Sequence, residues 1–198
     1  MSDTAELNGL EIAIIGMAGK FPGADNVKDF WKNLENGVES VTFFTDQELE
    51  ANHVDSQLYK NPKYVKAACV LNDIEKFDPS FFGLTPREAE TMDPQLRIFL
   101  ECSWEALEDS GYDPYRYEGK IGLFSSSGMS TYLLRNIMSA YDLRNSQQIR
   151  QIWLGNDPNY ISTYTSYKYN LKGPSFNIQT ACSSSLGGNP FMRCTVTH

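Results

Sequence analysis

The chain has 198 residues, of which 41% are hydrophobic and 21% charged, and this is the composition of one globular domain or a large part of one. Its net charge of −8 argues against a basic face, so we expect neither nucleic acid nor a membrane as a partner. No secretory leader or long apolar span occurs, which predicts a cytoplasmic protein.

The cysteines and histidines do not form a metal-ligand pattern. The four cysteines lie far apart without a Cys-x-x-Cys pair, which favours free thiols: Cys69, Cys102, Cys182 and Cys194. His53 and His198 are the two histidines, and neither has a further ligand at the spacing that zinc sites require. We therefore expect no bound metal.

The N-terminal part predicts a strand, a loop and a helix. Residues 12–15 form a continuous apolar run, "IAII", which is typical of a strand buried on both faces of a parallel sheet. The next stretch, "GMAGKFPG", has glycines and a lysine, but their spacing does not fit a phosphate-binding loop, so we interpret it as a tight connection. Helical spacing then predicts a helix over residues 27–36, with Asp25 or Asn26 as its cap.

The clearest helix begins after Asp93, an N-cap acid followed by proline, and ends at Gly111. One face is apolar: Leu96, Phe99, Leu100, Trp104 and Leu107. The other face is acidic, which we interpret as a solvated surface rather than a catalytic carboxylate pair: Glu101, Glu105, Glu108 and Asp109. Residues 38–84, before this helix, show weak periodicity, and we interpret them as an irregular excursion.

The remaining elements alternate between strands and helices. Two strands and two helices are predicted, the strands at residues 121–124 and 175–179 and the helices at residues 131–140 and 158–170. Asp157 caps the last of these helices, and a turn, "SSSG", follows the first of these strands. This alternation predicts an α/β layered fold with a parallel or mixed sheet.

Cys182 is the candidate catalytic residue. It lies in "QTACSSSL", between the last predicted strand and a helix start, where α/β folds gather reactive groups. The free N–H groups of a helix N-terminus stabilise a thiolate and can hold the oxyanion of a tetrahedral intermediate. The small neighbouring residues leave room for a bulky thioester. The pattern indicates a nucleophile, with a buried, unreactive cysteine as the structural alternative.

The chain resembles the N-terminal half of a β-ketoacyl synthase (ketosynthase) domain of the modular polyketide synthase type. The resemblance runs from residue 12 to residue 186 through motifs in one order: "IAIIGMAGKFPGADNVKDFWKNLENG", "FDPSFFGLTPREAETMDPQLRIFLECSWEALEDSGYDP", "GNDPNY", "SYKYNLKGPS" and "QTACSSSL". Several long motifs in order are far more specific than any single one. One departure is at Tyr164 and Thr165, where the family usually has an arginine and an aliphatic residue.

The resemblance implies an α/β, thiolase-like layered fold, with helices over a mixed sheet, of which this chain holds the N-terminal half. It also implies a homodimer in intact relatives and an acyl carrier protein as partner, whose phosphopantetheine arm delivers the substrate, with no cofactor bound to the chain itself. By resemblance, Cys182 accepts the acyl group from this thioester, and its backbone N–H serves as an oxyanion donor.

In that family, two histidines from the second half complete the reaction. They promote decarboxylation of a malonyl-type extender, whose carbanion attacks the cysteine-bound acyl group and forms a carbon–carbon bond in polyketide or fatty-acid-like biosynthesis. Neither histidine motif occurs in these residues, because His53 and His198 match no catalytic position of the family. We therefore expect a truncated chain that is inactive alone and accepts little acyl group at Cys182.

Three segments follow from the resemblance: an N-terminal tail (residues 1–10), a ketosynthase half-domain (residues 11–186) and a tail outside the family pattern (residues 187–198). The last tail has two glycines and a proline where the family continues a helix. In a helix each glycine costs about 1 kcal/mol and an interior proline about 3 kcal/mol relative to alanine. Only a short helical stub is expected after Cys182.

Two further functions are alternatives. A non-catalytic interaction half-domain would pair with another ketosynthase chain, because half of a two-part core leaves an apolar patch uncovered. A free-standing cysteine hydrolase is less favoured, since no histidine is placed to act as its base.

Overall fold

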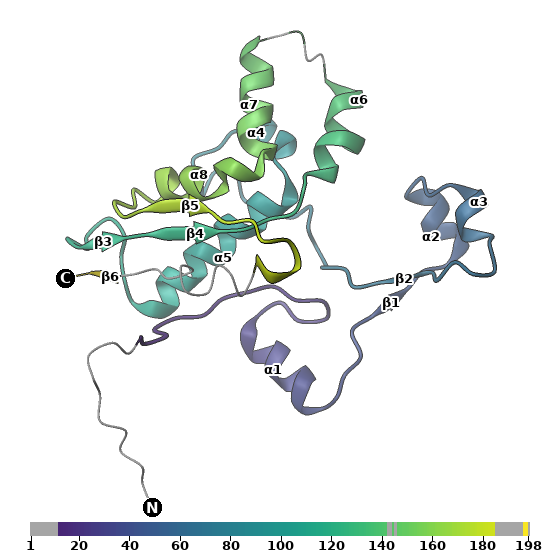
Figure 1. The fold of residues 1–198 in the computed structure, drawn as a ribbon, viewed down its shortest axis with the longest axis horizontal. Coiled ribbons are helices and arrows are strands. Elements are labelled where there is room, and N and C mark those ends of the chain that lie inside the picture. The colour runs from purple at the N-terminus through teal and green to yellow at the C-terminus, as the bar shows by residue number, and fades with distance from the viewer. Residues whose placement is uncertain (1–11, 142–143, 145, 185–195, 198) are drawn as a thin grey trace, which may run out of the picture. The chain divides into compact units, whose positions relative to one another are not determined.

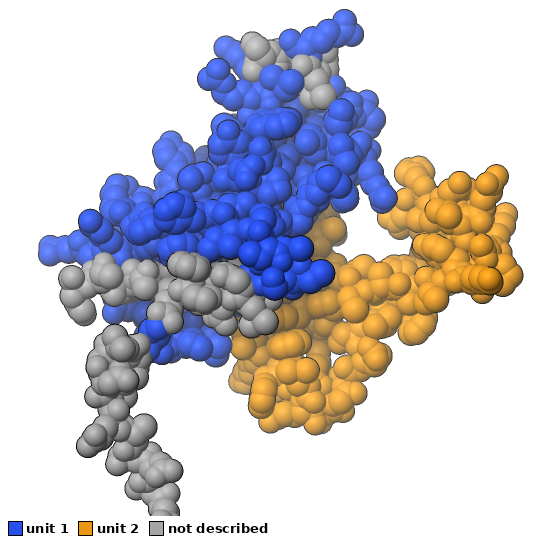
Figure 2. All heavy atoms as spheres, viewed as in Figure 1, with its two compact units in different colours: residues 1–18, 79–198 blue, residues 19–78 orange. Residues whose placement is uncertain are grey.

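The computed structural model of the chain describes residues 12–141, 144, 146–184 and 196–197. Figure 2 shows two compact units: unit 1 consists of Met1–Ala18 and Pro79–His198, and unit 2 consists of Gly19–Asp78. Each unit has buried residues of its own, such as Leu49 in unit 2 and Leu100 in unit 1.

Unit 2 contains short helices and strands: α1 (Val27–Glu35), β1 (Thr42–Phe43), α2 (Asp46–Ala51), α3 (Ser56–Tyr59) and β2 (Ala67–Ala68). β1 and β2 pair antiparallel, with Thr42 opposite Ala68. The interpretation of residues 38–84 as irregular is therefore partly wrong. A local signal for α2 was present, because Thr45 and Glu48 form a capping box, whose hydrogen bonds lower the pKa of the Glu48 carboxyl.

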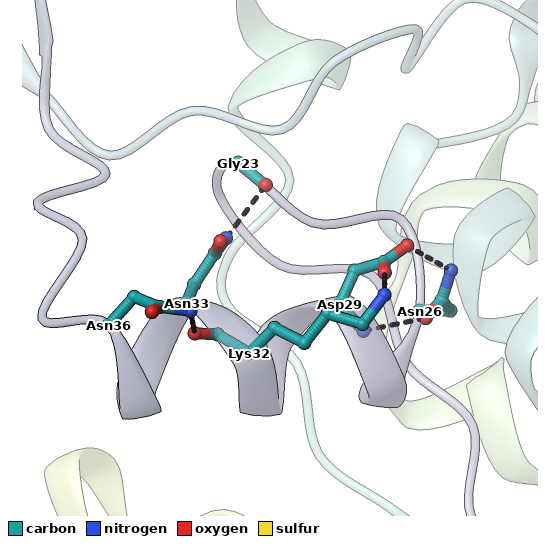
Figure 3. A network of polar contacts seen from close by, with 6 residues as sticks. All are labelled: Gly23, Asn26, Asp29, Lys32, Asn33 and Asn36. Atoms are coloured by element: carbon teal, nitrogen blue, oxygen red, sulfur yellow. Dashed lines mark hydrogen bonds and ion pairs between the residues drawn. The ribbon is translucent and has the colours of Figure 1, made fainter.

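α1 begins and ends close to the predicted positions. Figure 3 shows the Asn26 side chain accepting a hydrogen bond from the backbone N–H of Asp29 (2.9 Å) and donating one to the Asp29 carboxylate (2.8 Å). Lys32 Nζ also donates to this carboxylate (2.8 Å), and this hydrogen bond is the main reason why the pKa of Asp29 is lowered. The predicted helix is confirmed, with Asn26 as its cap.

The part of "GMAGKFPG" that belongs to unit 2 forms a tight turn before α1. The backbone groups of Phe21 and Ala24 exchange two hydrogen bonds, of 2.8 and 3.0 Å. Gly23 has a φ of 74°, which a glycine adopts without strain, and its carbonyl accepts a hydrogen bond from Asn33 Nδ2 (2.9 Å; Figure 3). This geometry agrees with the interpretation of the stretch as a tight connection.

Unit 1 contains the longer elements. Its helical segments are α4 (Pro86–Thr91), α5 (Pro94–Ser110), the π-helical η1 (Leu133–Ile137), α6 (Met138–Ala140), α7 (Ser146–Asn156), the 3-10 segment η2 (Pro158–Tyr160), α8 (Ile161–Lys168) and the 3-10 segment η3 (Ala181–Ser183). Its strands are β3 (Lys120–Ile121), β4 (Leu123–Ser125), β5 (Ser175–Asn177) and β6 (Val196–Thr197), and β3 pairs antiparallel with β6. Among the described residues, no helix has both the length and the apolar composition needed to cross a bilayer.

β4 and β5 form the parallel pair that leads to the candidate site. Leu123 lies opposite Ser175, and Ser125 lies opposite Asn177. α8 packs along both strands, and the strands lie side by side in Figure 1. The two strands predicted at residues 121–124 and 175–179 are therefore confirmed in position. Because the strands are parallel, their carboxyl ends meet at the same edge.

α5 follows its sequence signals. Asp93 caps the helix by accepting a hydrogen bond from the Gln95 N–H (2.7 Å), and Gly111 ends it with a φ of 75°. The predicted apolar face is buried at three positions: Leu96, Leu100 and Leu107. The helix packs against α8, and the hydroxyl of Tyr169 donates a 2.6 Å hydrogen bond to the Leu100 carbonyl.

The strand predicted at residues 12–15 is not present, so this prediction is wrong. Ile14 is 79% exposed, and Ile12 and Ile15 are 49% and 45% exposed. The segment instead runs along α5, where the Met17 N–H donates to the Asp109 carboxylate (2.8 Å). An apolar run predicts burial but does not supply a partner strand, and residues 12–15 pair with no strand among the described residues.

The helices after β4 are confirmed in part. The helix predicted over residues 131–140 is present, and η1 lies within it as a π-helical stretch. The helix predicted over residues 158–170 consists of η2 and α8, and Asp157 caps it by accepting from the Asn159 N–H (2.9 Å). α7 has no counterpart among the predicted elements, although Ile149, Ile152 and Trp153 recur at helical spacing.

Candidate active site

Cys182 lies in a tight turn shortly after β5. The strand ends at Asn177, and Cys182 is the middle residue of η3, a single 3-10 turn. Ala181 has a φ of 50°, a left-handed conformation that costs free energy for a residue with a Cβ. Cys182 is exposed to solvent, so it is not the buried small hydrophobe of the structural alternative.

Serine hydroxyls satisfy the backbone of this turn. Ser183 Oγ donates to the Thr180 carbonyl and Ser184 Oγ donates to the Ala181 carbonyl, each at 2.8 Å. Ser184 Oγ also accepts from the Thr180 N–H (3.0 Å). These are local bonds of the kind that serine forms in turns, so the "SSS" run is explained by the turn as well as by its small size.

A second loop lies beside this turn, because β4 and β5 end at the same edge. The N–H of Ile178 donates to the Ser125 carbonyl (2.8 Å), which extends the contact between the strands past β5. Gln179 Nε2 then donates to the Ser127 carbonyl (2.6 Å), and Ser126 Oγ donates to Gln179 Oε1 (3.4 Å). The loop over residues 126–128 and the segment that enters the Cys182 turn are thus joined by one glutamine side chain.

The same loop is held from its other end by α5. The Gly128 N–H donates to Gln95 Oε1 (3.0 Å), and Gln95 Nε2 donates to the Gly128 carbonyl (3.4 Å). Gln95 lies in the first turn of α5, next to the cap at Asp93. The loop is therefore fixed both to the strand that precedes Cys182 and to a helix with a buried face.

A buried hydroxyl of α8, that of Ser162, is hydrogen-bonded to both strands. Ser162 Oγ donates to the Phe176 carbonyl (2.6 Å), which leaves Ser125 Oγ as the donor in the 2.5 Å contact between the two serines. Ser162 and Ser125 are almost completely buried, where unpaired hydroxyls would be costly. This network fixes the register of β5, the strand that leads to Cys182.

Tyr164 and Thr165, where the resemblance leads us to expect an arginine and an aliphatic residue, lie on the same helix. Thr165 is completely buried, and its Oγ1 has no hydrogen-bond partner. Burial raises the pKa of the Tyr164 phenol to about 12, and Lys168 Nζ lies 5.7 Å from the centre of its ring. The hydroxyl of Thr165 is thus a buried polar atom without a partner within α8.

The other candidate groups are divided between the two units and the residues that the structure does not describe. His53 is an exposed residue of unit 2 with a φ of 57°, and His198 lies outside the described residues. Cys69 is exposed in unit 2, Cys102 is half-buried on α5, and Cys194 lies outside the described residues.

In the described part of the chain, no three His, Cys, Asp or Glu residues lie close enough to hold a metal ion. The acidic face of α5 is exposed at Glu105 and Glu108, and Asp109 accepts the bond from Met17.

The residues that support the site, Gln179 and Gln95, were not predicted from the sequence. Gln179 bonds to residues 52 and 53 positions away, and Gln95 bonds to a residue 33 positions away. No local pattern reports such contacts. The one available signal was the position of Gln179 at the start of "QTACSSSL", the segment that carries the candidate nucleophile.

Comparisons with known proteins give a consistent result. A family profile described as "Beta-ketoacyl synthase, N-terminal domain" matches residues 10–188. The chain is 45% identical over 181 residues to a subunit of the phenolphthiocerol/phthiocerol polyketide synthase of Mycobacterium tuberculosis, and the match covers 88% of this chain and 12% of that protein. It is 37% identical over 179 residues to the fatty acid synthase of Anser anser anser, covering 89% of this chain and 46% of that sequence.

Solved structures agree with these matches. Ketosynthase twelve of the bacillaene polyketide synthase from Bacillus amyloliquefaciens superposes with a TM-score of 0.75 at 38% identity, over 89% of this chain and 30% of that one. An oxazolomycin ketosynthase domain from Streptomyces albus gives 0.73 at 30% identity, over 92% of this chain and 31% of that one. The expected α/β, thiolase-like fold is confirmed, and the chain covers only part of it.

Proposed function

The chain belongs to the β-ketoacyl synthase family, and from this premise we propose that it is the acyl-accepting part of a ketosynthase, with Cys182 as the nucleophile. The exposed thiol in the turn after β5 is the observation that supports this proposal most strongly. The partner is an acyl carrier protein, and the substrate is the acyl thioester on its phosphopantetheine arm.

The first half-reaction is a thioester exchange. The Cys182 thiolate attacks the carbonyl carbon of the incoming thioester, and the Cys182 N–H stabilises the resulting oxyanion. The tetrahedral intermediate collapses, the carbon–sulfur bond to phosphopantetheine breaks, and the released thiolate takes up a proton. The acyl group is then bound to Cys182 as a new thioester.

The second half-reaction forms the carbon–carbon bond. A malonyl-type extender loses carbon dioxide, and the carbanion that forms attacks the acyl carbonyl and displaces the Cys182 thiolate. Family members use two histidines of their second half for this step, and the 198 residues contain neither motif. We propose that residues 11–186 form the acyl-accepting half of a domain whose intact relatives are homodimers, and that these 198 residues alone do not catalyse condensation, because neither histidine motif occurs in them.

The proposal is tested by identifying which cysteine is acylated, not by measuring turnover. When the chain is incubated with a short acyl thioester of N-acetylcysteamine, we expect slow, incomplete acylation at Cys182 in preference to Cys69, which is also exposed. Peptide mass spectrometry identifies the modified cysteine, and Cys182→Ala should abolish the preferred modification while Cys69→Ala leaves it unchanged. Equal modification of both cysteines would contradict the role of Cys182, and β-ketoacyl product after addition of a malonyl thioester would contradict the proposed inactivity in condensation.

A second candidate function is supported by exposed apolar side chains. Phe176 on β5 is 58% exposed, and the unpaired segment with Ile12 and Ile14 is also apolar and exposed. Such surfaces favour an interaction half-domain that pairs with another ketosynthase chain without catalysis. This function predicts a stable assembly larger than the monomer in size-exclusion chromatography, and Phe176→Ser should dissociate it. A monodisperse monomer at all concentrations would count against it.

A further inference from the structure

Gln179 has no part in the chemistry proposed above, yet its side chain is the link between the two loops of the site. The ladder between β4 and β5 ends at Asn177, and the last backbone bond between them is from the Ile178 N–H to the Ser125 carbonyl. The Gln179 side chain makes the next connection, three residues before Cys182. Its amide donates to the Ser127 carbonyl (2.6 Å), while its Oε1 accepts from Ser126 Oγ (3.4 Å).

The loop that Gln179 binds is itself fixed. Gln95 in the first turn of α5 binds both backbone groups of Gly128, at 3.0 and 3.4 Å. α5 in turn has buried leucines and packs on α8. Gln179 therefore joins the Cys182 segment to a loop that is anchored in the core of unit 1, rather than to a free loop.

The turn at Cys182 needs such an anchor because its backbone is strained. Ala181 has a φ of 50°, and residues hold such conformations only where the surrounding structure constrains them. The hydroxyls of Ser183 and Ser184 constrain the turn from within, and their partners among the described residues are residues 180 and 181. The side chain of Gln179, by contrast, reaches out of the segment to the loop that follows β4.

We propose that Gln179 is a positioning residue for Cys182: its amide ties the start of the strained turn to the loop over residues 126–128, and so holds the thiol where an acyl thioester reaches it. This inference rests on the proposed function of Cys182 as the acyl acceptor. The donated bond to the Ser127 carbonyl is the essential one, because it is short and because a carbonyl needs a donor. Gln179→Glu keeps the size of the side chain but removes this donor.

The test compares Gln179→Ala and Gln179→Glu with the unchanged chain and with Gln57→Ala, which replaces an exposed glutamine of unit 2. Two quantities are measured for each protein. The first is amide hydrogen exchange of residues 180–184, which reports the order of the turn without any chemistry. The second is the ratio of acylation at Cys182 to acylation at Cys69 by the N-acetylcysteamine thioester, with Cys69 as an internal reference in the other unit.

Both Gln179 variants should exchange the amides of residues 180–184 faster, and their acylation ratio should fall by about tenfold, as expected for a misplaced reacting group. The urea midpoint and the Gln57→Ala results should stay close to those of the unchanged chain. Unchanged amide exchange in both Gln179 variants would overturn the positioning role, as would a Gln179→Glu variant that behaves like the unchanged chain. If the unchanged chain shows no preference for Cys182, the proposed function fails instead, and the exchange data still decide the role of Gln179.

Discussion

Replacing Asn156 with alanine should lower the free energy of unfolding by about 3 kcal/mol, because it breaks a buried hydrogen-bond network. Asn156 Nδ2 donates to the carbonyls of Thr91 (2.7 Å) and Ile152 (2.8 Å), and Asn156 Oδ1 accepts from Ser130 Oγ (3.0 Å). Ser130 Oγ also accepts from the Leu133 N–H (3.1 Å). One side chain thus joins the end of α7 to the end of α4 and to the start of the helix that contains η1.

The expected loss of unfolding free energy is large because the hydrogen-bond partners of Asn156 stay buried after the substitution. Thr91 and Ser130 are both nearly inaccessible to solvent, so water does not replace the lost amide without a structural change. Asn156→Asp should also destabilise, since a carboxylate cannot donate to the two carbonyls. Urea unfolding followed by circular dichroism measures the effect.

The matched control is Asn159→Ala, three residues further along the "GNDPNY" motif, where the side chain is exposed. Its midpoint should stay within the experimental error of the unchanged chain. If Asn156→Ala were as stable as Asn159→Ala, the network would have no role in holding α4, α7 and the helix with η1 together.

Gly173→Ala should destabilise the chain by a similar amount, about 3 kcal/mol, because the new methyl group has no space. A Cβ at Gly173 would lie 2.5 Å from both the Gly122 N and the carbonyl carbon of Ile121. These are backbone atoms and do not move aside as a flexible side chain does. The Gly173 N–H also donates to the Ile121 carbonyl (2.9 Å), so the substitution forces apart the segments that start the β4–β5 pair.

Gly128→Ala is the control for the general effect of removing a glycine. Its Cβ would meet only Gln95 Oε1, at an ordinary contact distance of 3.5 Å, and alanine lowers the entropy of the unfolded chain in both variants. Thermal unfolding should therefore show a lower midpoint for Gly173→Ala and a nearly unchanged one for Gly128→Ala. Equal unfolding midpoints would show that the backbone near Gly122 shifts to make room for the methyl group without a loss of stability.

The helices were predictable where their signals are local. Asn26 caps α1, Asp93 caps α5 and Asp157 caps η2, in each case by a bond to a residue two or three positions away. Such contacts form within one turn of chain, so the sequence reports them directly. The same kind of local signal, at Thr45 and Glu48, marks the start of α2 within residues 38–84.

The strand predicted at residues 12–15 shows the limit of this reasoning. An apolar run indicates that a segment favours burial. A strand also needs a neighbouring strand that forms hydrogen bonds with its backbone N–H and C=O groups. β4 and β5 pair although about fifty residues separate them in the sequence, whereas residues 12–15 lie along α5 with Ile14 exposed. Whether a run becomes a strand is decided by which segments the whole fold brings beside it.

The sequence by itself determined the family resemblance, the α/β class, the main helix ends and the choice of Cys182 as candidate nucleophile. Only the tertiary structure decided that Ala181 adopts a strained turn, that Cys182 is exposed, and that Gln179 and Gln95 anchor the neighbouring loop. The physical reason is the range of the interactions. Caps and periodicity act within a few residues, but the contacts around Cys182 join segments that meet only when the strands and helices of unit 1 have packed together.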